Sequence, residues 1–84
     1  MQTRYKAKLR RWAECDISEP FDVVVLDTKT GTLHCSPRTL SEKDAESFHM
    51  KIENLSESCV EFMLAGWNPD GTSEDFDNIE GRTL

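Results

Sequence analysis

The chain has 84 residues and no run of more than four apolar residues. A transmembrane helix needs about 20 predominantly apolar residues, and a secretory signal needs an apolar stretch of about 7–15 residues near the N-terminus. The sequence contains neither pattern. We therefore expect a cytoplasmic protein that does not interact with a membrane.

Cysteine, histidine and glycine are scarce, and their spacing argues against the usual metal and phosphate sites. The three cysteines Cys15, Cys35 and Cys59 are far apart, and no Cys-x-x-Cys or His-x-x-x-His pattern is present. We expect three free thiols, no metal and no cofactor. The four glycines are scattered, so the chain has no glycine-rich loop to hold a phosphate.

Catalytic residues are equally hard to find. Only His34 and His49 could serve as the base for a nucleophile, and His49 adjoins an apolar helical stripe where packing explains its presence. A domain of this length has little room for a substrate pocket of roughly 300–1,000 Å³. We predict that the protein is not an enzyme, and we keep a small metal-binding or enzymatic domain as the last alternative.

The clearest structural signal is a β-hairpin over residues 21–35. The apolar, mostly β-branched run at 23–26 is typical of a strand that is buried on both faces, and so of a central strand. Asp27 begins the turn, and Gly31 provides the positive φ that lets the chain return. The predicted register pairs Asp27 with Thr32, Leu26 with Leu33, and Val24 with Cys35.

The segment before the hairpin fits two patterns. Within residues 3–15, the apolar Tyr5, Ala7 and Leu9 alternate with basic residues as in a strand, whereas Tyr5, Leu9 and Trp12 have the spacing of one helical face. We predict a strand, because the central strand at 21–27 needs a second neighbour.

After the hairpin, Ser41 is predicted to cap a helix. Its apolar stripe is Ala45, Phe48, Ile52 and Leu55, and its end is expected between residues 54 and 58. Residues 59–67 are predicted as a strand, because the tight-turn signal at 68–71 follows them. Residues 72–76 form a weak return strand in this interpretation, with Phe76 opposite Leu64.

The predicted fold class is therefore α+β. A small antiparallel sheet carries one amphipathic helix, in the order β-β-β-α-β with an optional short fifth strand. Residues 1–76 form a single domain, and residues 77–84 form a frayed acidic tail. One helix covers only one face of the sheet, so the other face needs cover from the tail, from a second copy of the chain or from a partner protein.

Charge divides the chain into two parts. Residues 1–11 contain five bases and no acid, whereas residues 12–84 contain five bases and sixteen acids, a balance of −11 within a net charge of −6. Attraction between the two parts is the simplest interpretation.

Two functional hypotheses from different classes use these charges. The first is an acidic protein-binding module, an inhibitor acting as a nucleic-acid mimic. Its partner would be a protein with a basic nucleic-acid-binding groove, by analogy with small acidic proteins of phages and mobile elements. The candidate acidic residues are Glu42, Asp44, Glu46, Glu53, Glu57, Glu74, Asp75 and Asp77.

The second hypothesis is direct nucleic-acid binding by the N-terminal strand. Its candidate residues are Arg4, Lys6, Lys8, Arg10, Arg11 and Trp12. On one face of a strand, alternate bases lie about 7 Å apart, close to the per-strand spacing of phosphates in an extended nucleic acid. We consider this alternative weaker, because the negative charge on the rest of the chain opposes approach to a polyanion. A homodimer also remains open.

Overall fold

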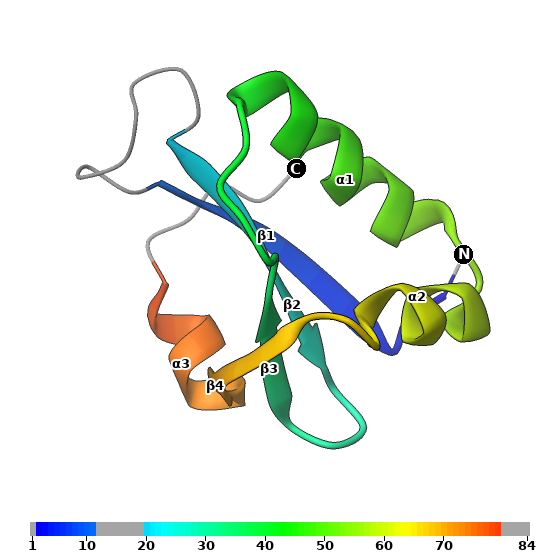
Figure 1. The fold of residues 1–84 in the computed structure, drawn as a ribbon. Helices are drawn as coiled ribbons and strands as arrows, with labels where there is room; N and C mark the ends of the chain where they lie inside the picture. Colours follow the sequence, from blue (N-terminus) through cyan, green and yellow to red (C-terminus); the bar gives the residue numbers. More distant parts are fainter. Residues whose placement is uncertain (1, 12–19, 80–84) are drawn as a thin grey trace.

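The computed structural model describes residues 2–11 and 20–79 and contains a four-stranded antiparallel sheet with helices on both faces (Figure 1). The strands lie in the order β1-β2-β3-β4. The predicted α+β class is confirmed. In chain order the elements are β1 (Tyr5–Arg11), β2 (Phe21–Asp27), β3 (Thr32–Cys35), α1 (Glu42–Asn54), α2 (Glu57–Leu64), β4 (Asn68–Thr72) and α3 (Ser73–Asn78).

The hairpin of β2 and β3 has the predicted register, with Asp27 opposite Thr32, Leu26 opposite Leu33, and Val24 opposite Cys35. Gly31 has a φ of 74°, which the turn requires and which a residue with a Cβ rarely adopts. The predicted N-terminal strand is confirmed at Tyr5–Arg11, where β1 pairs with β2 along its whole length, and residues 12–15 lie outside the described residues. The central position of β2 is confirmed as well.

The first helix begins where the sequence indicates. Ser41 caps α1 and accepts a hydrogen bond from the backbone N–H of Asp44 at 3.2 Å. The helix ends at Asn54 and buries Ala45, His49 and Ile52 against the sheet.

The strand predicted at residues 59–67 is wrong, because residues 57–64 form helix α2. Ser56 caps this helix and accepts a hydrogen bond from the N–H of Cys59 at 3.4 Å. Val60 and Leu64, four residues apart, point to the core. The apolar run is therefore divided between two faces of a helix.

The tight turn predicted at 68–71 and the return strand predicted at 72–76 are also wrong. Residues 68–72 form the edge strand β4. Proline has no N–H to donate to a neighbouring strand, and Pro69 is tolerated because it lies on an edge strand, where the pairing with β3 shifts register between Leu33 and His34. The next segment is helix α3, which begins with a capping box between Thr72 and Asp75.

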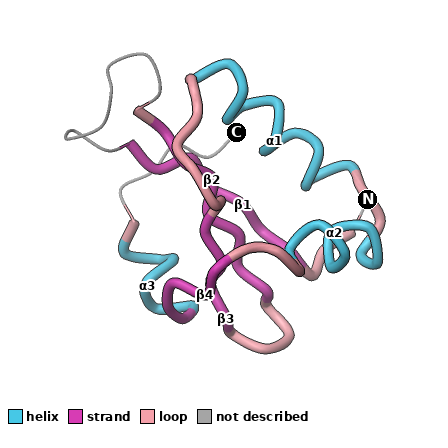
Figure 2. Tube along the Cα trace, viewed as in Figure 1, coloured by secondary structure: helices cyan, strands magenta, loops and turns pink. Residues whose placement is uncertain are grey.

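Two apolar clusters lie on opposite faces of the sheet. The first joins the odd-numbered residues of β1 and β2 to α1 and α2. The second joins Val24, Leu26 and Leu33 to Phe76, with Ile79 packed against them. Figure 2 shows the strands between α3 on one side and α1 with α2 on the other.

The C-terminal segment thus covers the second face of the sheet. Phe76 is 5% exposed in the second cluster, and the prediction that it faces Leu64 is wrong because Leu64 belongs to the first. The boundary predicted at residue 77 falls inside α3, and the rest of the predicted tail, residues 80–84, lies outside the described residues. Within the described part of the chain, no helix has both the length and the apolar character needed to cross a membrane.

Candidate protein-binding surface

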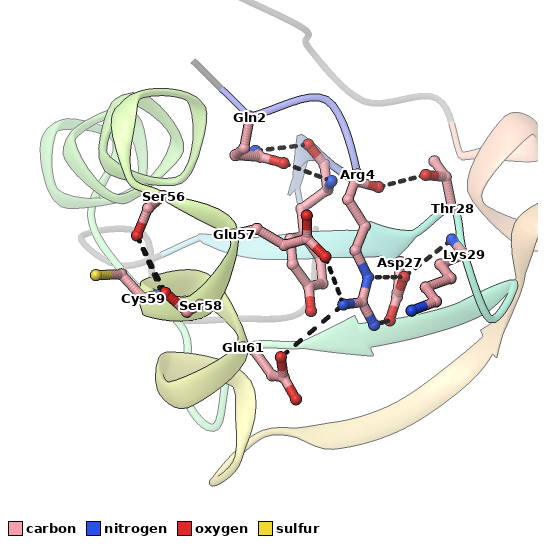
Figure 3. Close-up of polar contacts among 11 residues, drawn as sticks. Gln2, Arg4, Asp27, Thr28, Lys29, Ser56, Glu57, Ser58, Cys59 and Glu61 are labelled. Carbon is pink, nitrogen blue, oxygen red and sulfur yellow. Dashed lines mark hydrogen bonds and ion pairs between the residues drawn. The ribbon is translucent and has the colours of Figure 1, made fainter.

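Arg4, directly before β1, and Arg10 of β1 lie in ion pairs within the molecule. Arg4 donates from Nε to Asp27 Oδ1 at 2.8 Å and from Nη2 to Asp27 Oδ2 at 2.7 Å (Figure 3). Its Nη1 donates to Glu57 Oε1 at 2.8 Å. Each carboxylate thereby gains a charge-assisted hydrogen bond, and Asp27 gains a bidentate pair.

Arg10 has the same arrangement at the other end of the strand. It lies opposite Asp22 in the β1–β2 register and forms a bidentate pair with it, at 3.1 Å and 2.7 Å. Its Nη1 donates to Asp70 Oδ2 at 2.9 Å. The two arginines therefore join β1 to acids from β2, α2 and β4, in line with attraction between the basic and acidic parts of the chain.

The remaining basic candidates do not form one continuous surface. Lys8 donates to the carbonyl oxygen of Phe76 at 2.7 Å, and its Nζ lies 4.4 Å from the centre of the Phe76 ring. Lys6 and Arg11 are exposed. Trp12 lies outside the described residues. The regular ladder of positive charge predicted for β1 is thus interrupted by internal contacts.

The pair with Arg4 dominates the electrostatics of Asp27. Its hydrogen bonds lower the pKa of Asp27 to about 2, with the backbone N–H of Lys29 adding to this effect, although burial of the carboxylate opposes it. The same bonds to Asp27 and Glu57 raise the pKa of Arg4. Burial raises the pKa of the neighbouring Tyr5 hydroxyl.

The sheet separates the acidic candidates into two groups. Glu42, Asp44, Glu46, Glu53 and Glu57 lie on α1 and α2, whereas Glu74, Asp75 and Asp77 lie on α3 on the opposite face. Asp75 accepts hydrogen bonds from the N–H and the hydroxyl of Thr72, at 2.9 Å and 3.4 Å, and so serves to start α3. The acidic candidates therefore do not lie on a single surface.

The helices α1 and α2 also present two exposed apolar side chains, which the sequence analysis did not identify. Phe62 is 85% exposed and Met50 is 59% exposed. Phe62 points outward because Val60 and Leu64 occupy the buried face of α2. We name the exposed side chains of α1 and α2, with Phe62 among them, the α1–α2 surface. The Ser56 cap signal could have predicted this helix and with it the exposure of Phe62.

A hollow of about 440 Å³ opens beside the α1–α2 surface, between α2 and the hairpin. It forms because the helices pack over β1 and β2 and leave the β3 residues Thr32 and His34 only half-buried. Its lining residues are Arg4, Tyr5, Asp27, Thr30, Thr32, His34, Glu61, Leu64 and Ala65. The hollow combines carboxylates, hydroxyls and a short apolar wall.

No protein-family model, curated protein or solved structure matches this chain. What the structure itself defines is a small α+β domain of the order β-β-β-α-α-β-α.

Among residues 2–11 and 20–79, no three His, Cys, Asp or Glu side chains are grouped closely enough to hold a metal ion. Cys35 and Cys59 have free thiols, and Cys15 lies outside the described residues.

Proposed function

We propose that the protein is a small acidic protein-binding module that applies its α1–α2 surface to a basic groove of a nucleic-acid-handling protein in the cytoplasm. The observation that carries the proposal is the position of Phe62. Its side chain is 85% exposed, whereas Val60 and Leu64 of the same helix are buried. Exposed aromatic side chains of this kind are frequent anchors of protein interfaces.

The arrangement of charge supports a basic partner. Helices α1 and α2 carry several carboxylates, among them Glu61 directly before Phe62 in the sequence, and Arg4 and Arg10 are already engaged in ion pairs. Exposed carboxylates speed the encounter with a cationic surface. An aromatic side chain that becomes buried on binding then helps to hold the complex. Blocking such a groove would make the protein an inhibitor that mimics a nucleic acid.

Two alternatives have less support. Direct nucleic-acid binding through β1 would use Arg4 and Arg10, and each of these already forms a bidentate pair with an aspartate. A homodimer through the α1–α2 surface would bring equal acidic surfaces together, which is unfavourable at low ionic strength.

The proposal can be tested by affinity capture from a lysate with three immobilised proteins: the wild type, Phe62→Ala and Lys6→Gln/Arg11→Gln. We expect Phe62→Ala to lose most of the captured partner, because truncation removes the anchor. The double variant should retain the partner, because Lys6 and Arg11 lie on β1 and not on the α1–α2 surface. They belong to the strand that the nucleic-acid alternative would use. Denaturation midpoints of both variants should match the wild type, because all three side chains are exposed.

A titration with short single- and double-stranded oligonucleotides at low salt completes the test. Binding that is tight, salt-sensitive and lost in Lys6→Gln/Arg11→Gln would contradict the proposal and favour the basic strand. Capture that is unchanged by Phe62→Ala would contradict it as well.

A further inference from the structure

We infer that the hollow beside α2 receives an arginine side chain of the basic partner. This inference rests on the proposed function and names the group that this part of the surface binds. The hollow adjoins α2, because Glu61 and Leu64 of this helix and its C-cap residue Ala65 line it, and Phe62 directly follows Glu61 in the sequence. A partner that covers Phe62 can therefore reach the hollow with a long side chain.

The first argument is a deficit of positive charge. The single guanidinium of Arg4 faces three carboxylates, at 2.7 Å from Asp27, 2.8 Å from Glu57 and 3.9 Å from Glu61. Asp27 takes the bidentate pair, and Glu61 makes only the longest contact. Arg4, Asp27 and Glu61 line the hollow and together carry a net charge of −1, and Glu57 draws on the same guanidinium from outside the lining. A second cation would stabilise this group of carboxylates.

The second argument is the chemistry of the other walls. Thr30 and Thr32 contribute hydroxyl groups, and His34 Nδ1 is buried with no hydrogen-bond partner among the described residues. Leu64 and Ala65 form an apolar wall that suits the methylene groups of a long basic side chain. A guanidinium has five N–H donors and so can use several acceptors together.

The third argument is access. The hollow of about 440 Å³ is open to solvent and is not an enclosed pocket. Glu61, which lines the hollow, is 68% exposed, and Glu57, which shares the Arg4 guanidinium with it, is 52% exposed. A side chain carried by another protein can therefore enter directly from solvent, and the exposed carboxylates can attract it before contact.

The test uses the full chain, a capped tri-arginine peptide and a matched tri-citrulline peptide, which has a similar shape without the charge. Binding is followed by the backbone amide signals of the protein in NMR spectra at low salt. We expect tri-arginine to shift the signals of Thr30, Thr32, His34 and Ala65. Tri-citrulline should leave them unchanged.

Three variants localise the effect. Glu61→Gln should weaken tri-arginine binding about two- to fivefold, the range expected for one exposed ion pair. Ala65→Leu should weaken it by filling the hollow without any change of charge. Glu74→Gln is the matched control, because it removes the same charge from α3 on the opposite face and should change the affinity less than Glu61→Gln does.

Equal weakening by Glu61→Gln and Glu74→Gln would show that the peptide responds only to total charge, and the inference would fail. Shifts confined to residues outside the hollow, equal binding of tri-citrulline, or no binding of tri-arginine would overturn it as well. Failure of the proposed function is a separate outcome, because it is measured by the loss of partner capture in Phe62→Ala and does not depend on the peptide.

Discussion

Replacing Arg4 with Gln should destabilise the fold in a way that depends on pH. Asp27 has a side chain only 7% exposed and pairs with Arg4 at 2.7 Å, so the variant leaves a buried carboxylate without its cation. In the wild type the pKa of Asp27 falls from 3.8 to about 2. At about 1.4 kcal/mol per unit of pKa, the interactions of the Asp27 carboxylate together contribute at most about 2–3 kcal/mol to the free energy of unfolding near neutral pH, and the hydrogen bonds from Arg4 are the largest of them.

The sign of the pH dependence follows from the direction of the shift. The pKa of Asp27 is lower in the folded than in the unfolded chain, so its contribution is fully present above about pH 4. It decreases as the pH falls toward 2, where the folded state also takes up the proton. The difference in stability between the wild type and Arg4→Gln should therefore be largest between pH 5 and 7 and should shrink below pH 4.

Urea denaturation of the wild type, Arg4→Gln and Arg11→Gln at several pH values from 3 to 7 measures this difference. Arg11→Gln makes the same change at an exposed position of β1 and should alter the unfolding free energy by less than about 0.5 kcal/mol. The reasoning would be refuted if Arg4→Gln matched this control at pH 7, or if its effect were the same at pH 3 as at pH 7.

Three further outcomes can be measured on the purified protein. Gly31→Val should lower the unfolding free energy by about 1–3 kcal/mol because φ is 74° there, and an unchanged urea midpoint would contradict this. Phe76→Ala should cost about 3–5 kcal/mol, whereas Phe62→Ala should cost almost nothing; similar losses would contradict the assignment of faces. Peptide mapping of iodoacetamide labelling should find exposed Cys59 modified faster than half-buried Cys35, whose pKa is raised by burial; the reverse order would contradict the structure.

The parts of the fold that local sequence determines were predictable. The hairpin register follows from Asp27, Gly31 and the apolar run between 23 and 26, all within one short segment. The cap at Ser41 is also a local signal. The hairpin and the start of α1 agree with the structure, because no distant contact is needed to choose between alternatives. The pattern along β1 fitted a strand and a helix, and only the need of the central strand for a second neighbour decided between them.

Residues 59–67 were not predictable in the same way. Short apolar runs fit a buried strand and a helix equally well, and the following Asn-Pro-Asp-Gly segment favoured a strand. The alternative signal, the cap at Ser56, is weaker. With residues 59–67 predicted as a strand, Phe62 had no assigned face, and its exposure on α2, the strongest feature of the α1–α2 surface, was missed.

The hollow and its ion pairs could not have been predicted from the spacing of residues along the sequence. Arg4 pairs with Asp27 across 23 residues of sequence and with Glu57 across 53. Such contacts depend on the placement of α2 over β1, which the sequence pattern did not reveal. The charge division between the two parts of the chain did predict attraction between them, but not which side chains meet.

Hydrogen exchange of the chain alone and in complex with its captured partner tests the central claim most directly, because it maps the covered surface without any mutation. The proposal predicts slower exchange in α2, in the adjacent end of α1 and in the hairpin residues 28–34 around the hollow. Protection confined to β1 and α3, with unchanged exchange in α2, would contradict it.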